Sequence, residues 1–449
     1  MSKEKNPAPT SEIAALKKEI KDLRQYNKDL ERLINSKSFR VSRKIAHTFN
    51  HAFPFESKRR EVVLAAGKGV LSTAKKYRNR KIISAQKILK KAIGDSNVII
   101  YDSIPWDVDL RQRPQHLAEQ LSKFDDFVVY LERGGTKTIR KVNDQLYTIN
   151  HLSVLEGIKN TDGRKVFLAS STNVHSEVYK AVKNTFKDDT FGLVYEYIDD
   201  ISDDISPNVY ELQSFYDSVK EHKPLLTLAS SKRLRQNLID DGFDKKNILL
   251  SENATNVEHF DYTKIEPTVP SDLKSILETG RPIVGFYGAL APWLDGDLMN
   301  KIAKKRKDLE FVYIGPDYGG GKASFKQYKN THFLGAKNYE VLPNYGLYFD
   351  CAVIPFKLGD IAKSTSPVKL FEYMAMGIPT VGTADLNELH GYDYVYVSKD
   401  ETTFEKDIDK AITDKKKSAA RQKLLAQAKQ NTWEQRAKDI IDYLNGGKK

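Results

Sequence analysis

The sequence predicts an α/β protein in which two domains with parallel sheets follow an N-terminal helical region. From Asn97 onward, apolar or β-branched runs alternate with helix-length segments, which is typical of a parallel sheet with helices on both faces. The alternation restarts after Pro267 and Pro270, which predicts a second domain of the same kind. A chain of 449 residues is long enough for two or three domains with sizeable cores.

Eleven strands are expected from these runs. In the first domain (96–275) they are Val98–Ile104, Phe127–Leu131, Lys165–Ser170, Gly192–Tyr197, Leu225–Ser230 and Ile248–Leu250. In the second domain (276–430) they are Ile283–Gly288, Phe311–Gly315, His332–Gly335, Ala352–Pro355 and Thr380–Gly382. No third sheet is expected after them.

Residues 1–10 are expected to form a loose tail, and residues 11–36 a coiled coil. The apolar positions of the coil keep a spacing of three and four residues; they are Ile13, Leu16, Ile20, Leu23, Leu30 and Ile34. Asn27 falls at an a-type position, where a buried Asn favours a parallel two-stranded coil. We therefore expect a homodimer through residues 11–34, against the alternative of a single helix that packs on its own protein.

Residues 37–95 form a basic helical segment. Between Lys37 and Ile93, sixteen Lys and Arg residues face only two acids, Glu56 and Glu61, whereas the whole chain has a net charge of +12. Two helix-like runs, Glu61–Lys76 and Lys81–Ile93, could place apolar side chains against a bilayer while lysines meet anionic head groups. The segment thus predicts an anionic membrane surface as partner. The alternative is a pair of solvated linking helices; nucleic acid is not expected, because no known binding motif is present.

Cysteine usage and hydropathy indicate the compartment. The single cysteine, Cys351, excludes an internal disulfide and fits a reducing cytosol. The sequence has no signal peptide and no apolar run near 18 residues, so we expect no membrane-spanning segment. The expected location is the cytoplasm, with peripheral attachment to the inner face of the cell membrane.

The segment from Ser366 to Val381 carries the strongest chemical signal. Ser366 is a preferred N-cap and Pro367 suits the first helical position, so a helix with an anion-binding amino end should begin here. Lys369 could reach the same anion, and the carboxylate of Glu372 lies among apolar neighbours, where it needs a polar partner such as a sugar hydroxyl. Gly377 should end the helix. The alternative is an amphipathic helix in which Lys369 and Glu372 merely pair.

This helix resembles the nucleotide-sugar-binding helix of GT-B glycosyltransferases, in which a Glu at the position of Glu372 holds the donor ribose. Bacterial glycosyltransferases of teichuronic-acid, capsule and cell-wall polysaccharide synthesis resemble the chain over several further segments. These are Trp106–Asp107, Gln112–Ala118, Val194–Asp200, Ala229–Leu238, Val284–Trp293, Phe311–Pro316, Phe333–Ala336 and Ile354–Lys357. The resemblance implies a GT-B architecture of two facing Rossmann-like domains with a central cleft, the first completed by a C-terminal helix at 431–445.

The sequence also departs from family 4 of these enzymes. Ser364 stands where that family has a second Glu, and the familiar Asn-Gly-Val-Asp turn reads Asn253-Ala254-Thr255-Asn256. The Arg and Lys that normally hold the diphosphate are missing from 288–297. We expect Lys357 and Lys369 to replace them.

The donor site should follow the carboxyl ends of the strands of the second domain, where ligands bind in open α/β sheets. The predicted donor-binding residues are Gly288, Trp293, Gly315, Pro316, Gly335, Ala336, Lys337, Lys357, Ser364, Thr365, Ser366, Lys369 and Glu372. By resemblance, 335–337 would meet the base, Glu372 the ribose, and Gly288 with 364–366 the diphosphate. The donor is a substrate, expected to be a UDP-sugar, and no cofactor is expected.

The first domain should bind the acceptor and supply the catalytic groups. Candidates are Arg113, His116, Asp199 and Asp200, each close to the end of a predicted strand. An Asp or His could act as general base in an inverting transfer, whereas a retaining transfer needs mainly leaving-group stabilisation. These residue types are compatible with both an inverting and a retaining transfer. Asp199 could instead cap a helix and Arg113 could pair with it structurally.

No bound metal is expected. Asp107-Val108-Asp109 matches the Asp-x-Asp signature of metal-dependent GT-A enzymes, but three-residue matches arise easily by chance. The leading function is a metal-independent glycosyltransferase that acts on a polysaccharide, glycolipid or teichoic-acid-type acceptor. A nucleotide-sugar epimerase of the same architecture and a non-catalytic scaffold are the alternatives.

Overall fold

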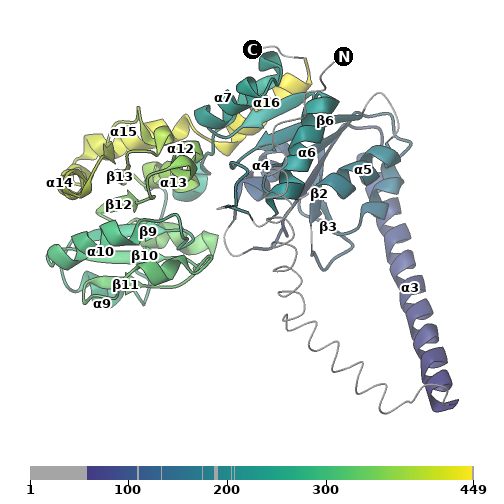
Figure 1. The fold of residues 1–449 in the computed structure, drawn as a ribbon, viewed down its shortest axis with the longest axis horizontal. Coiled ribbons are helices and arrows are strands. Elements are labelled where there is room, and N and C mark those ends of the chain that lie inside the picture. Colours follow the sequence, from purple (N-terminus) through teal and green to yellow (C-terminus); the bar gives the residue numbers. More distant parts are fainter. Residues whose placement is uncertain are drawn as a thin grey trace, which may run out of the picture. The chain divides into compact units, whose positions relative to one another are not determined.

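The computed structural model describes residues 58–446 except 109–110, 133, 174, 187–190, 204 and 207, with side chains from residue 76 onward. The predicted tail and coiled coil and the first part of the basic segment lie outside the described residues. The described chain contains two predominantly parallel sheets with helices between their strands, which confirms the predicted fold class (Figure 1).

The first sheet has eight strands in the order β3-β4-β2-β1-β5-β6-β7-β8. Their bounds are β1 Val98–Ser103, β2 Phe127–Glu132, β3 Ile139–Lys141, β4 Leu146–Ile149, β5 Lys165–Ser170, β6 Phe191–Tyr197, β7 Leu226–Ala229 and β8 Ile248–Leu250. All pairs are parallel except β3 with β4. The six expected strands are present within two residues of their predicted ends. The sequence analysis missed β3 and β4, because three or four residues at a sheet edge give no long apolar run.

The second sheet has six parallel strands in the order β11-β10-β9-β12-β13-β14. Their bounds are β9 Ile283–Tyr287, β10 Glu310–Ile314, β11 Thr331–Phe333, β12 Cys351–Ile354, β13 Thr380–Thr383 and β14 Val395–Ser398. The edge strand β14 was not predicted; it is four residues long and two of them are only half-buried. The chain runs from β9 outward to β10 and β11, then returns to the other side of β9 as β12 and continues outward to β13 and β14. The sheet therefore has a switch point between β9 and β12, where ligands bind in such folds.

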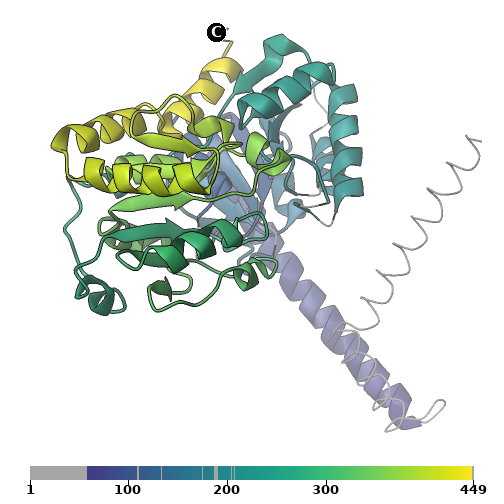
Figure 2. The same cartoon turned by 60° about the vertical axis from the view of Figure 1, so that its left-hand side comes forward.

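Helices separate these strands. In the first domain they are α4 Arg113–Leu121, α5 Ser176–Thr185, α6 Val209–His222 and α7 Lys232–Asp240, followed by the short α8 Val257–Phe260. In the second they are α9 Lys274–Leu277, α10 Gly296–Lys305, α11 Leu342–Gly346, α12 Asp360–Ser364, α13 Val368–Ala375, α14 Glu401–Lys415 and α15 Ser418–Lys429. The last helix, α16 Trp433–Leu444, returns to the first domain and packs on α4. Figure 2 shows this yellow C-terminal helix next to the teal elements of the first domain.

The basic segment contains one continuous helix, α3 (Lys58–Ile93), where two runs were expected. The connecting residues Tyr77–Arg80 include neither Gly nor Pro, so nothing in the sequence interrupts the helix. Ile82, Leu89 and Ile93 are buried in the core of the first domain, together with strand residues. The expectation that these three side chains meet a bilayer is therefore wrong.

Candidate functional site

The helix α13 starts at the carboxyl edge of the second sheet, one residue later than predicted. Pro367 is the N-cap residue, and no side chain caps the helix. Ser366 was predicted to be the N-cap, but its Oγ instead accepts a hydrogen bond from the Asn253 N–H at 3.1 Å. The backbone N–H groups of the first turn consequently receive no side-chain cap. Gly377 follows the helix with a φ of +62°, which confirms the predicted helix end.

Glu372 is the most unusual acid of this edge. Its side chain is buried, with 6% of the residue exposed, and it forms no ion pair within the described part of the chain. Burial raises the pKa of Glu372 to about 7, although the nearby Tyr287 hydroxyl and the Lys369 ammonium both lower it. A carboxylate held in this way gains free energy when a hydrogen-bond donor from a ligand reaches it.

Lys369 lies one turn before Glu372 and reaches the end of β9. A Cβ atom added to Gly288 would lie 2.8 Å from Lys369 Cε and 3.2 Å from Nζ. The ammonium lies 5.3 Å from the centre of the Phe286 ring. Burial lowers the pKa of Lys369 to about 8, while Glu372 raises it. The structure therefore places a half-buried cation beside the glycine of the first loop. Its replacement of the missing phosphate ligands stays a prediction.

Three predicted glycines lie side by side at the ends of neighbouring strands. The Gly288 N–H donates to Ile314, and the Gly315 N–H donates to the Gly335 carbonyl. Gly315 has a φ of +149°, and a Cβ atom there would lie 1.9 Å from the Gly288 carbonyl oxygen. Only glycine allows this approach, so the backbones of neighbouring strand ends lie close together at this edge. A Cβ atom added to Gly335 would meet nothing within 4 Å. Pro316 and Ala336 follow these glycines and are exposed.

Other predicted donor residues are held by contacts of their own. Lys337 Nζ donates to Asp272 at 2.7 Å, and Lys357 Nζ donates to the Pro292 carbonyl at 2.6 Å. Trp293 packs against Tyr318, with ring centres 5.5 Å apart. These three side chains shape the loops around the edge rather than point freely into it.

Ser364 is the last residue of α12, and Thr365 follows it in the turn to α13. Ser364 Oγ donates to the carbonyl of Asp360, and Thr365 Oγ1 donates to that of Ile361. Both hydroxyl protons are therefore used within the helix end, although each oxygen keeps lone pairs that can accept a hydrogen bond.

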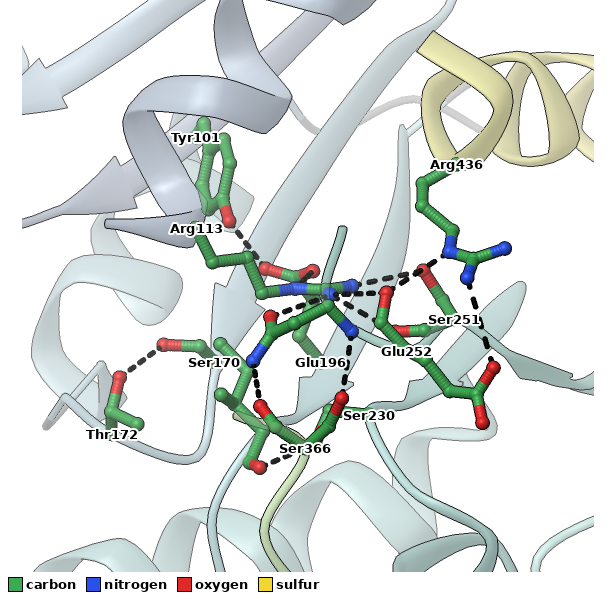
Figure 3. Close-up of polar contacts among 12 residues, drawn as sticks. Tyr101, Arg113, Ser170, Thr172, Glu196, Ser230, Ser251, Glu252, Ser366 and Arg436 are labelled. Atoms are coloured by element: carbon green, nitrogen blue, oxygen red, sulfur yellow. Dashed lines mark hydrogen bonds and ion pairs between the residues drawn. The ribbon is translucent and has the colours of Figure 1, made fainter. Parts of the chain in front are cut away.

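Arg113, in contrast, is fully engaged within the protein. Its residue is 4% exposed. Its Nε donates to Glu196 at 2.9 Å, while Nη1 and Nη2 donate to the carbonyl and hydroxyl of Ser251, each at 2.9 Å (Figure 3). The Glu196 carboxylate also accepts from the Tyr101 hydroxyl. The guanidinium thus pairs with Glu196 rather than with Asp199, and its geometry is that of a positioning residue.

His116 is buried between the two domains. Its ring stacks on Trp433 with a centre distance of 5.4 Å and lies 5.0 Å from that of Tyr339. Burial, together with a smaller effect of the Arg111 charge, lowers the pKa of His116 to about 3. An imidazole with so low a pKa is a weak base, so its chemistry does not favour the predicted role as general base.

The two predicted aspartates after β6 differ from each other. Asp200 accepts hydrogen bonds from the Tyr197 hydroxyl at 2.8 Å and from the Ile201 N–H at 3.0 Å, so its carboxylate organises the turn. Asp199 is partly exposed, and no hydrogen bond to its carboxylate is found in the described residues. Burial raises the pKa of Asp199 to about 6, although Arg113 lowers it. Asp199 is the better suited of the two to accept a proton near neutral pH.

The Asp-x-Asp segment is only partly described, since Asp109 lies outside the described residues. Asp107 pairs with Arg140 at 2.7 Å. Within the described part of the chain, no cluster of three His, Cys, Asp or Glu side chains could hold a metal ion. No helix there is long and apolar enough to cross a membrane.

The sequence analysis missed four residues of this region. Glu196 and Asn253 extend the hydrogen-bond network of Arg113. Tyr287 and Tyr339 lie near Glu372. Burial is the main cause that raises the pKa of each tyrosine, and the Glu372 carboxylate adds to it. Asn253 was noted only as part of a departing turn. Glu196 and Tyr287 lie in predicted strands, where they were not distinguished from core residues, and Tyr339 lies in the polar stretch 337–340, which carried no signal for it.

The second domain matches a known family. Residues 281–414 match the family described as "Glycosyl transferases group 1". That stretch contains every predicted donor-binding residue. Glu372, Lys369 and the three strand-end glycines therefore lie within the matched domain.

A curated relative comes from Bacillus subtilis (strain 168). The protein TuaH, whose provisional name is teichuronic acid biosynthesis glycosyltransferase, is 31% identical over 153 residues. The match covers 32% of this chain and 37% of TuaH, so the chain matches little more than a third of the length of this relative.

Solved structures resemble the chain over most of its length. HepE from Anabaena, solved with UDP and glucose, superposes with a TM-score of 0.57 at 16% identity, covering 78% of this chain and 99% of its own. Sucrose-phosphate synthase from Thermosynechococcus elongatus gives a TM-score of 0.59 at 13% identity, with 78% and 98% covered. At such identities the likeness concerns the fold, and it is the two-domain GT-B fold.

Proposed function

We propose that this group 1 glycosyltransferase of GT-B fold transfers a sugar from a nucleotide-sugar donor to a polysaccharide, glycolipid or teichoic-acid-type acceptor. The observation that carries the proposal is the buried Glu372, with its raised pKa, near Lys369 and the strand-end glycines of the second sheet. Ribose hydroxyls are suitable donors to this carboxylate. A diphosphate suits the cation and the uncapped amino end of α13.

UDP is the proposed nucleotide. HepE was solved with UDP and with UDP-glucose, and it shares the fold of this chain. TuaH supports a cell-wall polysaccharide as the proposed acceptor.

The proposed reaction divides between the two domains. Asp199 accepts the proton of the acceptor hydroxyl, whose oxygen forms a bond to the anomeric carbon of the donor. The bond from that carbon to the diphosphate oxygen breaks, and its electron pair leaves with UDP. Lys369 and the amino end of α13 stabilise the negative charge of the leaving group. No metal is required by these groups.

A screen of nucleotide-sugars by thermal shift tests the donor site. A bound donor at 100 times its dissociation constant should add about 2.7 kcal/mol of stability. We expect a selective rise with UDP-sugars that Glu372→Gln abolishes, since the amide keeps the volume but loses the charge. Glu310→Gln is the matched control, because Glu310 is equally buried and lies at the amino end of β10 in the same sheet. A donor response that survives Glu372→Gln would contradict the proposal.

Product analysis separates transfer from epimerisation. With donor and acceptor, the transferase should release UDP and extend the acceptor. An epimer formed from donor alone, without any acceptor, would instead favour the epimerase. Donor binding without turnover under any acceptor would favour the scaffold.

Peripheral attachment to the cytoplasmic face of a membrane is part of the proposal. Ile83 and Ile88 of α3 are 50% and 46% exposed and flank the face of the helix that buries Ile82 and Leu89. Three lysines, Lys87, Lys90 and Lys91, are exposed around them, and such a surface suits anionic lipid head groups.

Liposome flotation tests the attachment. Binding should require anionic lipid and should weaken in the double variant Lys87→Glu and Lys91→Glu. Equal binding to neutral vesicles would count against it. We further propose that residues 11–34 form a homodimer, for which sedimentation of the full chain and of a chain lacking these residues is the measurement.

A further inference from the structure

A continuous series of hydrogen bonds joins the core of the first domain to the donor loop. It runs from the Tyr101 hydroxyl to Glu196, from Glu196 to Arg113, and from Arg113 to the segment at 251–253 (Figure 3). The last members are Asn253 and Ser366, which are 113 positions apart in the sequence. All of these side chains are buried, where hydrogen bonds are stronger and missing partners are costly.

Asn253 makes three polar contacts, and the two made by its side-chain amide fix the orientation of that amide. Its Oδ1 accepts from Arg113 Nη1 at 3.3 Å, and its Nδ2 donates to the Ser366 carbonyl at 2.6 Å. Its backbone N–H donates to Ser366 Oγ. Because a guanidinium has only donors and a carbonyl is only an acceptor, the amide fits in a single orientation. Arg113 therefore directs the NH₂ group of Asn253 toward the donor loop.

Ser366 is the residue that this contact holds. It immediately precedes the N-cap of α13, and both its hydroxyl oxygen and its carbonyl accept from Asn253. Its position thus determines where the first turn of α13 and Lys369 lie relative to the first domain. Arg113 lies close enough to Asp199 to lower its pKa, so one guanidinium serves both the donor loop and the proposed base.

We propose that Asn253 is a positioning residue that aligns the donor loop with the acceptor domain, through an amide oriented by Arg113. This inference rests on the proposed function. The loop and α13 belong to the second domain, which contains every proposed donor-binding residue. The contact with Asn253 sets how the bound diphosphate faces the group that receives the acceptor proton.

The variant Asn253→Asp tests this role with almost no change in volume. The carboxylate keeps its contact with Arg113, but its second oxygen then faces the Ser366 carbonyl, and two acceptors repel each other. With the UDP-sugar selected by the thermal screen, we expect kcat to fall about 10- to 100-fold, while the dissociation constant of UDP changes less than about threefold.

Asn300→Asp is the matched control. Asn300 is also buried, and its Nδ2 donates to the Ser324 carbonyl at 2.8 Å while its Oδ1 accepts from the Lys326 N–H, outside the series that reaches Ser366. The same repulsion then arises away from the donor loop, so kcat should change little.

Each outcome decides a separate point. Wild-type kcat in Asn253→Asp, or a loss of UDP affinity as large as the loss of kcat, would overturn the positioning role. A wild-type protein that neither binds nor turns over any nucleotide-sugar would overturn the proposed function instead. If Asn253→Asp does not fold, Ser366→Ala gives the answer, because it removes one acceptor and should lower kcat with UDP affinity retained.

Discussion

The carboxyl edges of the two sheets differ in whether their ionisable side chains have partners within the protein. At the first sheet, Glu196 pairs with Arg113, and Glu132 accepts hydrogen bonds from the Trp106 N–H and the Thr148 hydroxyl. At the second sheet, Glu372 and Lys369 are desolvated without an ion pair in the described residues. Paired groups hold the fold together, whereas groups left without an ion-pair partner retain the interactions that a ligand can complete.

Asp199 is the exception at the first edge, because no hydrogen bond to its carboxylate is found in the described residues. Its replacement should have the largest effect on the rate of sugar transfer. We expect Asp199→Asn to lower the rate of sugar transfer about 100- to 10,000-fold, the usual contribution of a general base. The neighbouring Asp200→Asn should have a much smaller effect on the rate, because Asp200 is occupied by Tyr197 and Ile201. Transfer assays at saturating donor measure both variants. Equal losses would remove the distinction between the two aspartates.

The same kind of substitution should act differently at the two edges. Arg113→Met leaves Glu196 buried without its cation and should cost about 3 to 5 kcal/mol of unfolding free energy. Lys369→Met removes a half-buried cation that forms no ion pair with any described residue, so the ligand-free protein should lose little stability while donor affinity falls. Denaturant unfolding with and without UDP measures both. A large loss of stability in Lys369→Met would show that Lys369 is structural too.

Protonation of Glu372 should make donor binding depend on pH. Its pKa of about 7 lies above the unfolded value of about 4.3, so the ligand-free protein loses stability as pH rises through this interval. The loss of stability is complete only above about pH 7, where the Glu372 carboxylate is ionised. A ribose hydroxyl can then donate a hydrogen bond to the ionised carboxylate. The affinity for UDP-glucose should rise several-fold between about pH 6 and pH 7.5, below the point where Lys369 loses its proton.

Calorimetric titration measures this dependence. UDP-glucose is the appropriate probe, since its diphosphate has no proton to lose in this interval. Glu372→Gln should flatten the profile. A wild-type affinity that stays constant over the interval would mean that the carboxylate does not contact the nucleotide.

The sequence predicted those features that depend on local pattern. Buried parallel strands form continuous apolar runs, so eleven strands were placed, and the apolar neighbours of Glu372 predicted its burial. The short edge strands β3, β4 and β14 lack such runs. The predicted cap at Ser366 failed for a different reason, because its hydroxyl oxygen is taken by Asn253 from the other domain.

Contacts between distant segments explain the other differences. The sequence identified Arg113 as a candidate but could not show that Glu196 and Ser251 use its donors. Similarly, Lys337 and Lys357 are cations and so suited a phosphate site. In the folded protein, however, each donates a hydrogen bond to a residue that is distant in the sequence. Residue type predicts which chemistry is possible, and the availability of the side chain depends on tertiary packing.

A structure of the protein with UDP tests the central claim most directly. We predict that a ribose hydroxyl lies within hydrogen-bond distance of the Glu372 carboxylate, with the diphosphate between Gly288, Lys369 and the first turn of α13. A nucleotide bound away from the carboxyl edge of the second sheet, or bound there with its ribose remote from Glu372, would contradict the account.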